Sequence, residues 1–327
     1  MKTKFIYVLV STREDCYLEQ NLISAYSLRL HNPEANITVA IDRDTYNGLT
    51  GKRAEIKKYV TEFVIIDCPD GYNGMKKSRF IKTNLRKFVK GDFLYIDSDT
   101  VIAERLDEID DCGLELGAVY DSNRPQLISN GSSIADYYIN KSIEKLGWPS
   151  VIGWPNYNGG VMYAKDCETA RKFYERWFEL WTDCTKQNVN IDMPALCRAN
   201  IEMGGVIKEL PGIWNCQIQR QGLPLLSQAK IIHCFTGGNV CMYSLCTQKV
   251  LDKIKRIGYL DIDIIEMIKN AKNAFETSTT IVTSQEAVLI SYPIVQLFFE
   301  NYKLFRILNK LAELWFRLFK GRRFDYL

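Results

Sequence analysis

The stretch FLYIDSDTVI, residues 93–102, decides the fold of this chain. Its apolar and aromatic run from Phe93 to Ile96 predicts a buried strand. Two carboxylates follow, Asp97 and Asp99, and in an extended segment residues i and i+2 point the same way. Converging carboxylates repel one another unless a proton or a cation lies between them. Because Mg²⁺ and Mn²⁺ favour oxygen ligands, often carboxylates together with substrate phosphates, the stretch predicts a metal site for a phosphorylated substrate.

A second interpretation of the same residues is that Asp97 and Asp99 only form a turn after the strand, where Asp is common. A three-residue motif carries a real risk of a false positive. The motif alone therefore leaves both interpretations open, and the surrounding sequence has to decide between them.

The first half of the chain alternates between strand and helix patterns, which predicts βαβ units and a mostly parallel sheet. The expected strands are 4–10, 37–42, 63–67, 93–97 and 117–121, and the expected helices are 15–31, 49–60 and 76–89. Ligands of such sheets bind at the carboxyl ends of the strands. Asp42, Asp67, Asp97 and Asp121 each lie at or near such an end. The fold class is therefore α/β, a Rossmann-like domain whose central sheet is flanked by helices.

The second half is less regular. Residues 123–156 form a variable excursion, and strands are expected over 156–164, 205–211 and 230–235, with helices over 166–184 and 191–201. We expect a catalytic domain over 1–245, a helical extension over 246–290 and a tail over 291–327.

The tail has a composition of its own. Apolar residues recur at helical spacing from Tyr292 to Phe319, with Trp315 and Phe316 near the end. Residues 291–327 contain seven Lys/Arg and three acids, so the tail has a net charge of +4. Because the whole chain has a net charge of +3, the remaining residues carry −1. This predicts an amphipathic helix that lies on an anionic membrane surface. The alternative is a terminal helix packed on the domain with snorkelling lysines.

The overall composition, 46% hydrophobic and 25% charged, is that of a globular protein. The nearly neutral body gives no sign of a nucleic-acid partner. The ten cysteines include no CxxC pair, and the first ten residues do not form a convincing signal peptide. Reduced cysteines and a cytoplasmic location, peripheral on the inner face of the membrane, are the simplest expectation.

Three further groups of residues are candidates for binding. His233 follows a short apolar strand and would complete a Mn²⁺ site with Asp97 and Asp99, although a lone His there is more often structural. Gly237 and Gly238 would let backbone N–H groups approach a phosphate, or they form a plain turn. The expected helix before residue 93 is rich in cations that are mostly solvated, of which one or two face the phosphates: Lys76, Lys77, Arg79, Lys82 and Arg86.

The order of these motifs resembles glycosyltransferase family 8, the glycogenin and lipopolysaccharide galactosyltransferase group, over roughly residues 4–240. The most specific parts are FLYIDSDTVI as the DxD strand, NYNGGVMYA in place of the family's FNAGV strand, and IIHCFTGG in place of its C-terminal His motif. Weaker likenesses are the FIK segment, GAVYD, IDMPAL, and WN with Asn215. The resemblance implies a GT-A fold, a UDP-sugar donor and Mn²⁺ (or Mg²⁺).

It also implies individual roles. Asp97, Asp99 and His233 would hold the metal that bridges the UDP diphosphate, and Tyr17 would stack on uracil. Asn158 and Asp192 would act on the sugar as the catalytic pair. The remaining donor-binding residues implied are Ser11, Thr12, Lys82, Ser98, Asp121, Gly159, Gly237 and Gly238.

The chain departs from the family pattern twice. Asp192-Met193 stands where the family usually has Asp-Gln, and HCFTGGN has no matching Lys-Pro-Trp. The family retains anomeric configuration, and with Met193 in place of Gln, front-face attack steered by the leaving phosphate is easier to credit than a protein nucleophile. The implied function is hexosyl transfer from a nucleotide sugar to a glycan or lipid-linked acceptor, in cell-surface polysaccharide or lipopolysaccharide synthesis.

Two alternatives use the same residues. DSDTV fits the DxDx[TV] of haloacid-dehalogenase-type phosphatases, in which the first Asp is a nucleophile. That motif usually lies near the start of the domain, whereas three βα units precede it here. The missing Gln and Lys-Pro-Trp would also suit a non-catalytic protein that only binds a sugar nucleotide.

Overall fold

The computed structural model describes residues 1–130, 134–234, 243–275 and 292–320. These residues form two compact units. The larger contains Met1–Gln126 and Pro155–Thr280, and the smaller contains Leu127–Trp154 and Ile281–Leu327. The expected domain boundaries at 245 and 290 remain a prediction.

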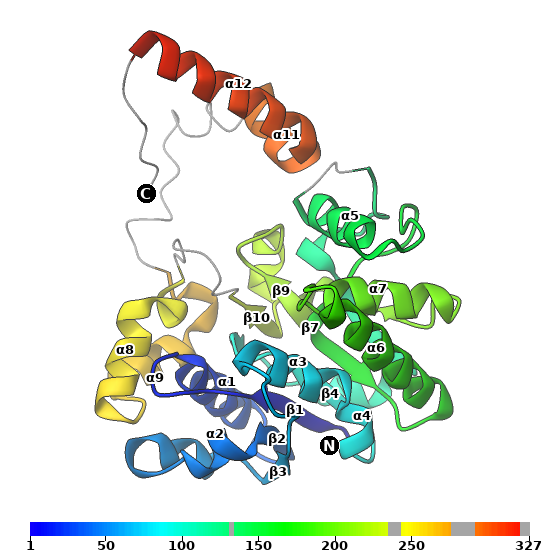
Figure 1. Cartoon of the computed structure of the whole chain (residues 1–327). Helices are drawn as coiled ribbons and strands as arrows, with labels where there is room; N and C mark the ends of the chain where they lie inside the picture. Colours follow the sequence, from blue (N-terminus) through cyan, green and yellow to red (C-terminus); the bar gives the residue numbers. More distant parts are fainter. Residues whose placement is uncertain (131–133, 235–242, 276–291, 321–327) are drawn as a thin grey trace. The chain divides into compact units, whose positions relative to one another are not determined.

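The larger unit is built on a seven-stranded sheet with the order β3-β2-β1-β4-β7-β6-β8 (Figure 1). All of these strands run in one direction except β7, which is antiparallel to both β4 and β6. Their bounds are β1 Lys4–Leu9, β2 Ile37–Asp42, β3 Glu62–Ile66, β4 Phe93–Ile96, β6 Leu116–Tyr120, β7 Tyr157–Ala164 and β8 Lys208–Glu209. The expected α/β fold with a mostly parallel sheet flanked by helices is confirmed.

A second, three-stranded sheet has the order β5-β10-β9. It consists of β5 (Thr100–Ile102), β10 (Ile231–His233) and β9 (Cys216–Gln217), and β10 is antiparallel to β5. Of these strands only β10 was expected, within 230–235, because strands of two or three residues give no readable alternation.

Helices cover both faces of the main sheet. Phe5, Tyr7 and Leu9 of β1 share a buried core with α1 (Tyr17–His31), α8 (Gln248–Ile257) and α9 (Ile262–Lys269). The other helices of this unit are α2 Arg43–Asn47, α3 Gly74–Thr83, α4 Leu85–Phe88, α6 Glu168–Lys186 and α7 Met193–Glu202. Of these, α3, α4, α6 and α7 pack together (Figure 1). Because side chains alternate along a strand, one sheet supports both layers.

The sequence-based expectations also differ from the structure at two helices and at one pair of cysteines. The helix expected over 49–60 is a 3-10 helix, η1 (Gly51–Lys58), preceded by α2. The helix expected over 76–89 is split into α3 and α4 at Asn84, whose φ and ψ of −103° and 6° are not α-helical. Cys234 and Cys246 are joined by a disulfide, which corrects the expectation that all cysteines are reduced.

The smaller unit contains α5 (Ile134–Leu146), α11 (Pro293–Glu300) and α12 (Tyr302–Lys320). The described part of the tail, 292–320, is therefore mostly helical but broken at Asn301. The Asn301 side chain accepts a hydrogen bond from the backbone N–H of Leu304 at 3.1 Å and so caps α12. Tyr137 of α5 packs edge-on against Tyr302 at 5.7 Å, and the guanidinium of Arg306 lies 5.0 Å from the Tyr137 ring. No helix among the described residues is both long and apolar enough to cross a bilayer.

Candidate functional site

Asp97 and Asp99 lie between β4 and β5, at the carboxyl end of the parallel strands. The backbone N–H of Asp97 still donates to Gly160 O of β7 at 2.7 Å, and the hydroxyl of Thr100 donates to Asp97 O at 2.9 Å, which closes a turn. The two carboxylates converge as expected, and they do so at a reversal of the chain between β4 and β5. The turn is the means by which the two side chains are brought to one place.

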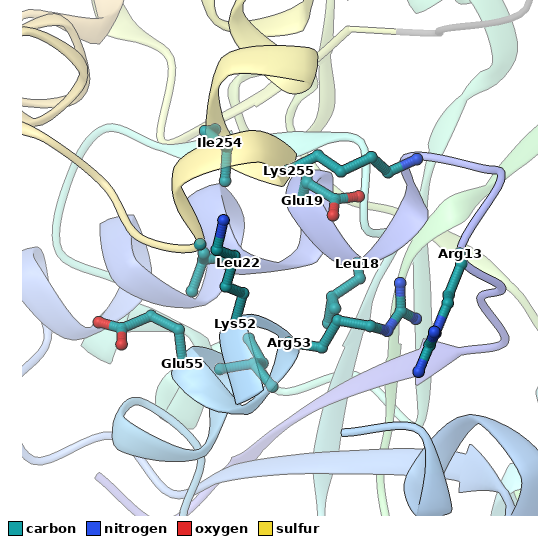
Figure 2. Close-up of a pocket in the computed structure, with 11 residues that line it drawn as sticks. Arg13, Leu18, Glu19, Leu22, Lys52, Arg53, Glu55, Ile254 and Lys255 are labelled. Atoms are coloured by element: carbon teal, nitrogen blue, oxygen red, sulfur yellow. The ribbon is translucent and has the colours of Figure 1, made fainter. Parts of the chain in front are cut away.

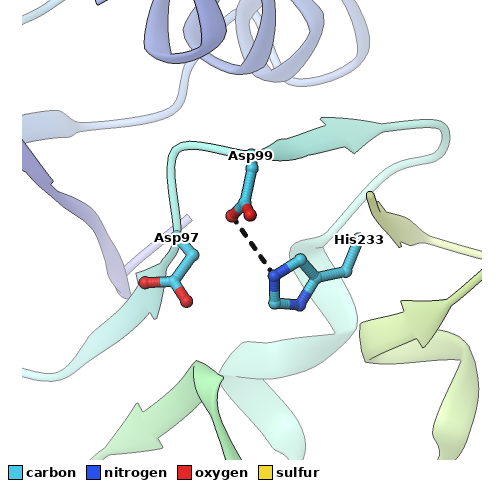
Figure 3. A group of neighbouring side chains, drawn as sticks. All are labelled: Asp97, Asp99 and His233. Carbon is cyan, nitrogen blue, oxygen red and sulfur yellow. Dashed lines mark ion pairs between the residues drawn. The ribbon is translucent and has the colours of Figure 1, made fainter. Parts of the chain in front are cut away.

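His233 reaches the same place through the small sheet. In the β5–β10 ladder His233 pairs with Thr100, and the next backbone N–H, that of Cys234, donates to Asp99 O at 2.9 Å. His233 Nε2 lies 3.2 Å from Asp99 Oδ1 (Figure 3). One ligand atom each from Asp97, Asp99 and His233 lies within 4.8 Å of the others. The candidate metal centre is therefore assembled from two different sheets.

The other ring nitrogen of His233 begins a chain of hydrogen bonds. Nδ1 lies 2.9 Å from Asn215 Oδ1, Asn215 Nδ2 donates to Asn158 Oδ1 at 2.9 Å, and Asn158 Nδ2 donates to Asp121 Oδ1 at 2.9 Å. Both ends of the Asn158 amide are fixed, because its oxygen also accepts from the backbone N–H of Gly160 at 2.8 Å. Asn215 must then present its oxygen to His233, so Nδ1 carries a proton and Nε2 is the ligand nitrogen.

The electrostatic surroundings of His233 favour its charged form. Burial lowers its pKa, but the ion pair with Asp99 and the nearby charge of Asp97 outweigh this effect, and the pKa is raised. In the absence of a cation, a proton on Nε2 takes the position between imidazole and carboxylate.

Two carboxylates and one imidazole fit Mn²⁺ well, and Mg²⁺ less well because Mg²⁺ prefers oxygen ligands alone. Gly160 makes room for the three ligands. A Cβ atom there would lie 2.8 Å from both Asn158 Oδ1 and Asp97 Oδ2, and it would contact His233 Cε1. Any side chain at residue 160 would therefore displace the ligands or their support.

A buried cluster of two cations and one carboxylate lies beside the metal ligands. Lys82 Nζ is 3.4 Å from Asp97 Oδ1 and 3.2 Å from Asp192 Oδ2, and Arg79 Nε is 3.0 Å from Asp192 Oδ1. Burial raises the pKa of Asp192, but Lys82 and Arg79 lower it to about 2. Asp192 raises the pKa of Arg79 in turn. Lys82 links the cluster to the metal site, since it contacts both Asp97 and Asp192.

A pocket of about 240 Å³ opens in front of these groups. It is lined by residues of β1, α1 and α3 and by the 97–99 turn, among them Thr12, Tyr17, Arg79, Ser98 and Asp99. Tyr17 is 53% exposed although it borders the pocket, so its ring is available to a ligand. Asp15 organises the loop after β1, accepting from the Ser11 hydroxyl and the Thr12 backbone N–H, each at 2.7 Å.

The structure brings together most of the residues predicted for the site. In one continuous region it places Thr12, Tyr17, Lys82, Asp97, Ser98, Asp99, Asp121, Asn158, Asp192 and His233. Gly159 borders Lys82 at ordinary contact distance, whereas Ser11 is buried and bonded to Thr45 and Asp15. Gly237 and Gly238 lie outside the described residues.

Three contributors were missed as site residues. Gly160 was passed over for Gly159, and Asn215 was noted only within the WN likeness. Arg79 was listed only with the mostly solvated cations, although it lies one helical turn before Lys82 and so shares its face. Arg86 lies in α4, beyond the break at Asn84, and is structural, since it donates to the backbone oxygens of Gly91 and Ala164.

Comparison with known proteins gives structural likeness only. No protein-family model and no curated protein matches the chain. Among solved structures it is similar to the galactosyltransferase LgtC, at 11% identity and a TM-score of 0.49, over 88% of this chain and 99% of that one. It is also similar to mouse xyloside xylosyltransferase 1 (12%, TM-score 0.44, 71% and 97%) and to the glycosyltransferase GlyE of Streptococcus pneumoniae (15%, TM-score 0.45, 86% and 67%).

Proposed function

We propose that this chain is a metal-dependent glycosyltransferase of the GT-A type, which moves a hexose from a UDP-sugar to a glycan or lipid-linked acceptor. The observation that carries the proposal is the Asp97–Asp99–His233 set, whose ligand types suit Mn²⁺. The two carboxylates of this set line a pocket together with Tyr17 and Arg79. A nucleoside diphosphate has the features that this arrangement matches, namely a flat base, a ribose and a charged diphosphate.

Asp97, Asp99 and His233 would hold the metal, which when bound would supply positive charge against the leaving diphosphate. The chain's own cations act on the same charge. Lys82 Nζ lies 3.4 Å from Asp97 Oδ1, and Arg79 lines the pocket. Both cations are therefore in position before the donor binds. Arg79 is our candidate for the positive charge that the absent Lys-Pro-Trp would otherwise supply.

The sugar would lie against Asp121, Asn158 and Asp192. Asp192 is a weak nucleophile here, because each of its oxygens faces a cation and its pKa is held at about 2. We therefore assign it to binding sugar hydroxyls. Without a good protein nucleophile, front-face attack by the acceptor accounts best for retention of anomeric configuration, and an inverted product would contradict this mechanism.

The test is a thermal-shift panel of UDP-, GDP- and CMP-sugars with and without Mn²⁺. We expect stabilisation by UDP-sugars that requires the metal, about 3 kcal/mol at one hundred times Kd. Transfer to an acceptor is then measured with the stabilising donor. Stabilisation by none of the donors, or hydrolysis of simple phosphate esters without a nucleotide sugar, would contradict the proposal and favour the phosphatase alternative.

We also propose that α12 attaches the chain to an anionic membrane, at the inner face if the chain is cytoplasmic. Its exposed apolar residues fall on one stripe, in which Leu311 is 58% and Leu318 71% exposed. The stripe consists of Leu304, Ile307, Leu311, Leu314, Trp315 and Leu318. Lys303, Lys310 and Arg317 recur every seven residues and border it on one side.

Co-sedimentation with vesicles tests this attachment. Binding to vesicles containing phosphatidylglycerol, and much weaker binding to pure phosphatidylcholine, is the expected result. Leu311→Glu should abolish the binding, while Asn309→Glu, which adds the same charge off the stripe, should weaken it only slightly. Equal effects of the two substitutions would contradict the proposal that this stripe binds the membrane.

A further inference from the structure

The larger unit contains a second pocket, whose Arg13 and Arg53 also line a third pocket that shares Thr12 with the proposed donor pocket. The second pocket has a volume of about 210 Å³ and is formed by the start of α1, by η1 and by α8 (Figure 2). No residue lines both this pocket and the donor pocket. Helix α1 divides the two, since Tyr17 and Gln20 border the donor pocket whereas Leu18, Glu19 and Leu22 border the second one.

The second pocket contains a buried acceptor. Glu19 is only 4% exposed, and its Oε2 atom has no hydrogen-bond partner among the residues that the structure describes. Buried polar atoms are rarely left unpaired in folded proteins. The pocket therefore has a position in which a hydrogen-bond donor of a ligand would be favourable.

The same pocket carries an excess of positive charge. Four cations border it, Arg13, Lys52, Arg53 and Lys255, against the two acids Glu19 and Glu55. Figure 2 shows Glu19 and Lys255 on one side of the pocket, with Arg13 and Arg53 on the other. Each guanidinium group presents several N–H donors in a fixed plane. Two neighbouring guanidinium groups therefore pair better with the oxygens of a phosphate than with those of a single carboxylate.

Two of these cations are already held in position. Arg53 Nη1 donates to Thr12 O at 2.7 Å and Nη2 to Ser11 O at 3.2 Å, and Lys255 Nζ donates to Asp15 O. The charged wall is thus preorganised, and little side-chain freedom is lost when an anion binds. Leu18, Leu22, Ile56 and Ile254 supply aliphatic surface for a carbon skeleton.

We propose that this pocket is a second ligand site, which binds a phosphorylated sugar or polyol. Its phosphate pairs with Arg13 and Arg53, and one of its hydroxyls donates to Glu19. Because Arg53 and Lys255 also hold the 11–15 loop, whose Thr12 and Asp15 border the donor pocket, a ligand here would be coupled to the donor pocket, and any such coupling is reciprocal.

The test is calorimetric titration of the full chain with D-glucose 6-phosphate, with D-glucose and inorganic phosphate as controls. We expect the sugar phosphate to bind about tenfold or more tightly than either control, since each control keeps only part of the contacts. Arg13→Ala and Glu19→Gln should each weaken binding about tenfold or more. Arg13 is exposed, so its substitution leaves the fold intact even if that of Glu19 does not.

Two controls distinguish this site from the donor pocket, namely the Asp97→Asn substitution and an excess of UDP with Mn²⁺. Neither should abolish binding of the sugar phosphate, whether or not the proposed transferase function is correct. Absence of binding, competitive displacement by UDP in which the apparent Kd of the sugar phosphate rises without limit, equal affinity for inorganic phosphate, or no effect of Arg13→Ala would each overturn the proposal.

Discussion

Two parts of the same sheet edge carry strand-end aspartates, and the structure treats them differently. At the β2–β3 part, Asp42 is 3.1 Å from Lys77, and Asp67 is 2.6 Å from Arg43. At the β4–β7 part, Asp97 and Asp99 face each other and His233, and they border a pocket. A strand-end position is thus shared by structural and candidate catalytic carboxylates. What distinguishes them is the second carboxylate and the imidazole at the same place, since one ligand atom each from Asp97, Asp99 and His233 lies within 4.8 Å of the others.

The largest effect is expected from removing one carboxylate at each part. Asp97→Asn should abolish stabilisation by Mn²⁺ with UDP and lower transfer at least ~1000-fold, because a metal ligand and a charge are lost together. Asp67→Asn is the matched control and should retain both properties. Thermal shift measures the stabilisation, and initial rates measure the transfer. Comparable losses in the two variants would show that the carboxylates at the two parts do not differ in function.

The support of His233 should matter next. Asn215→Leu removes the acceptor for Nδ1–H, and we expect Mn²⁺ affinity to fall ~10–100-fold, as for other partners of metal-binding histidines. Asn215→Asp keeps an acceptor and should lose less. The chain has only two histidines, so ¹⁵N-histidine NMR of the Mg²⁺–UDP complex can locate the Nδ1 proton directly. An unprotonated Nδ1 would disprove the orientation inferred for the Asn215 amide.

The affinity of the Asp97–Asp99–His233 site for Mn²⁺ should depend on pH. Because Asp99 and Asp97 raise the pKa of His233, a proton competes for Nε2 to a pH above the usual 6.5. Mn²⁺ affinity should rise up to about tenfold per pH unit as pH rises through this pKa, and then level off. In the metal-free protein, the stability from the charged His233–Asp99 pair is present below pH 6.5 and is lost over the same rise. Flat affinity from pH 6 to 8 would contradict this coupling.

A smaller effect is expected on stability. The pKa of Asp192 is lowered from 3.8 to about 2, so its ionised form stabilises the fold at neutral pH. This linkage corresponds to roughly 2 kcal/mol. We expect Asp192→Asn to be destabilised by about that amount above pH 4, with the difference from wild type shrinking between pH 4 and 2. Urea unfolding at several pH values provides the measurement, and a pH-independent difference would argue against the linkage.

The smallest effect is expected at the exposed β3 end. Arg43 and Asp67 are both largely exposed, and such pairs contribute little to stability. Asp67→Asn should unfold at the wild-type urea midpoint. A clear loss of stability would mean that this carboxylate is less dispensable than its exposure indicates.

The sequence predicted the parallel strands and the ligand types because long apolar runs and their terminal carboxylates are local features. It also predicted His233 as a ligand. It could not predict how His233 reaches Asp99, since that contact depends on the pairing of β5 with β10, strands of three residues each that lie about 130 positions apart in the sequence. The chain from His233 to Asp121 was equally hidden, because amides at 158 and 215 have no spacing that relates them. Arg79 was discoverable, since it lies one helical turn from Lys82.

The reversed direction of β7 has a consequence for how such a protein diversifies. Because β7 is antiparallel to β6, the end of one strand and the start of the other meet at the edge that carries the site, where Asp121 N–H donates to Asn156 O at 2.8 Å. The segment 127–154 leaves the larger unit and returns to it at that edge. An insertion between residues 126 and 155 therefore changes none of the strands that position Asp97, Asp99 and His233. Segments of different length and sequence can be exchanged at this point of the chain while those three side chains keep their supports.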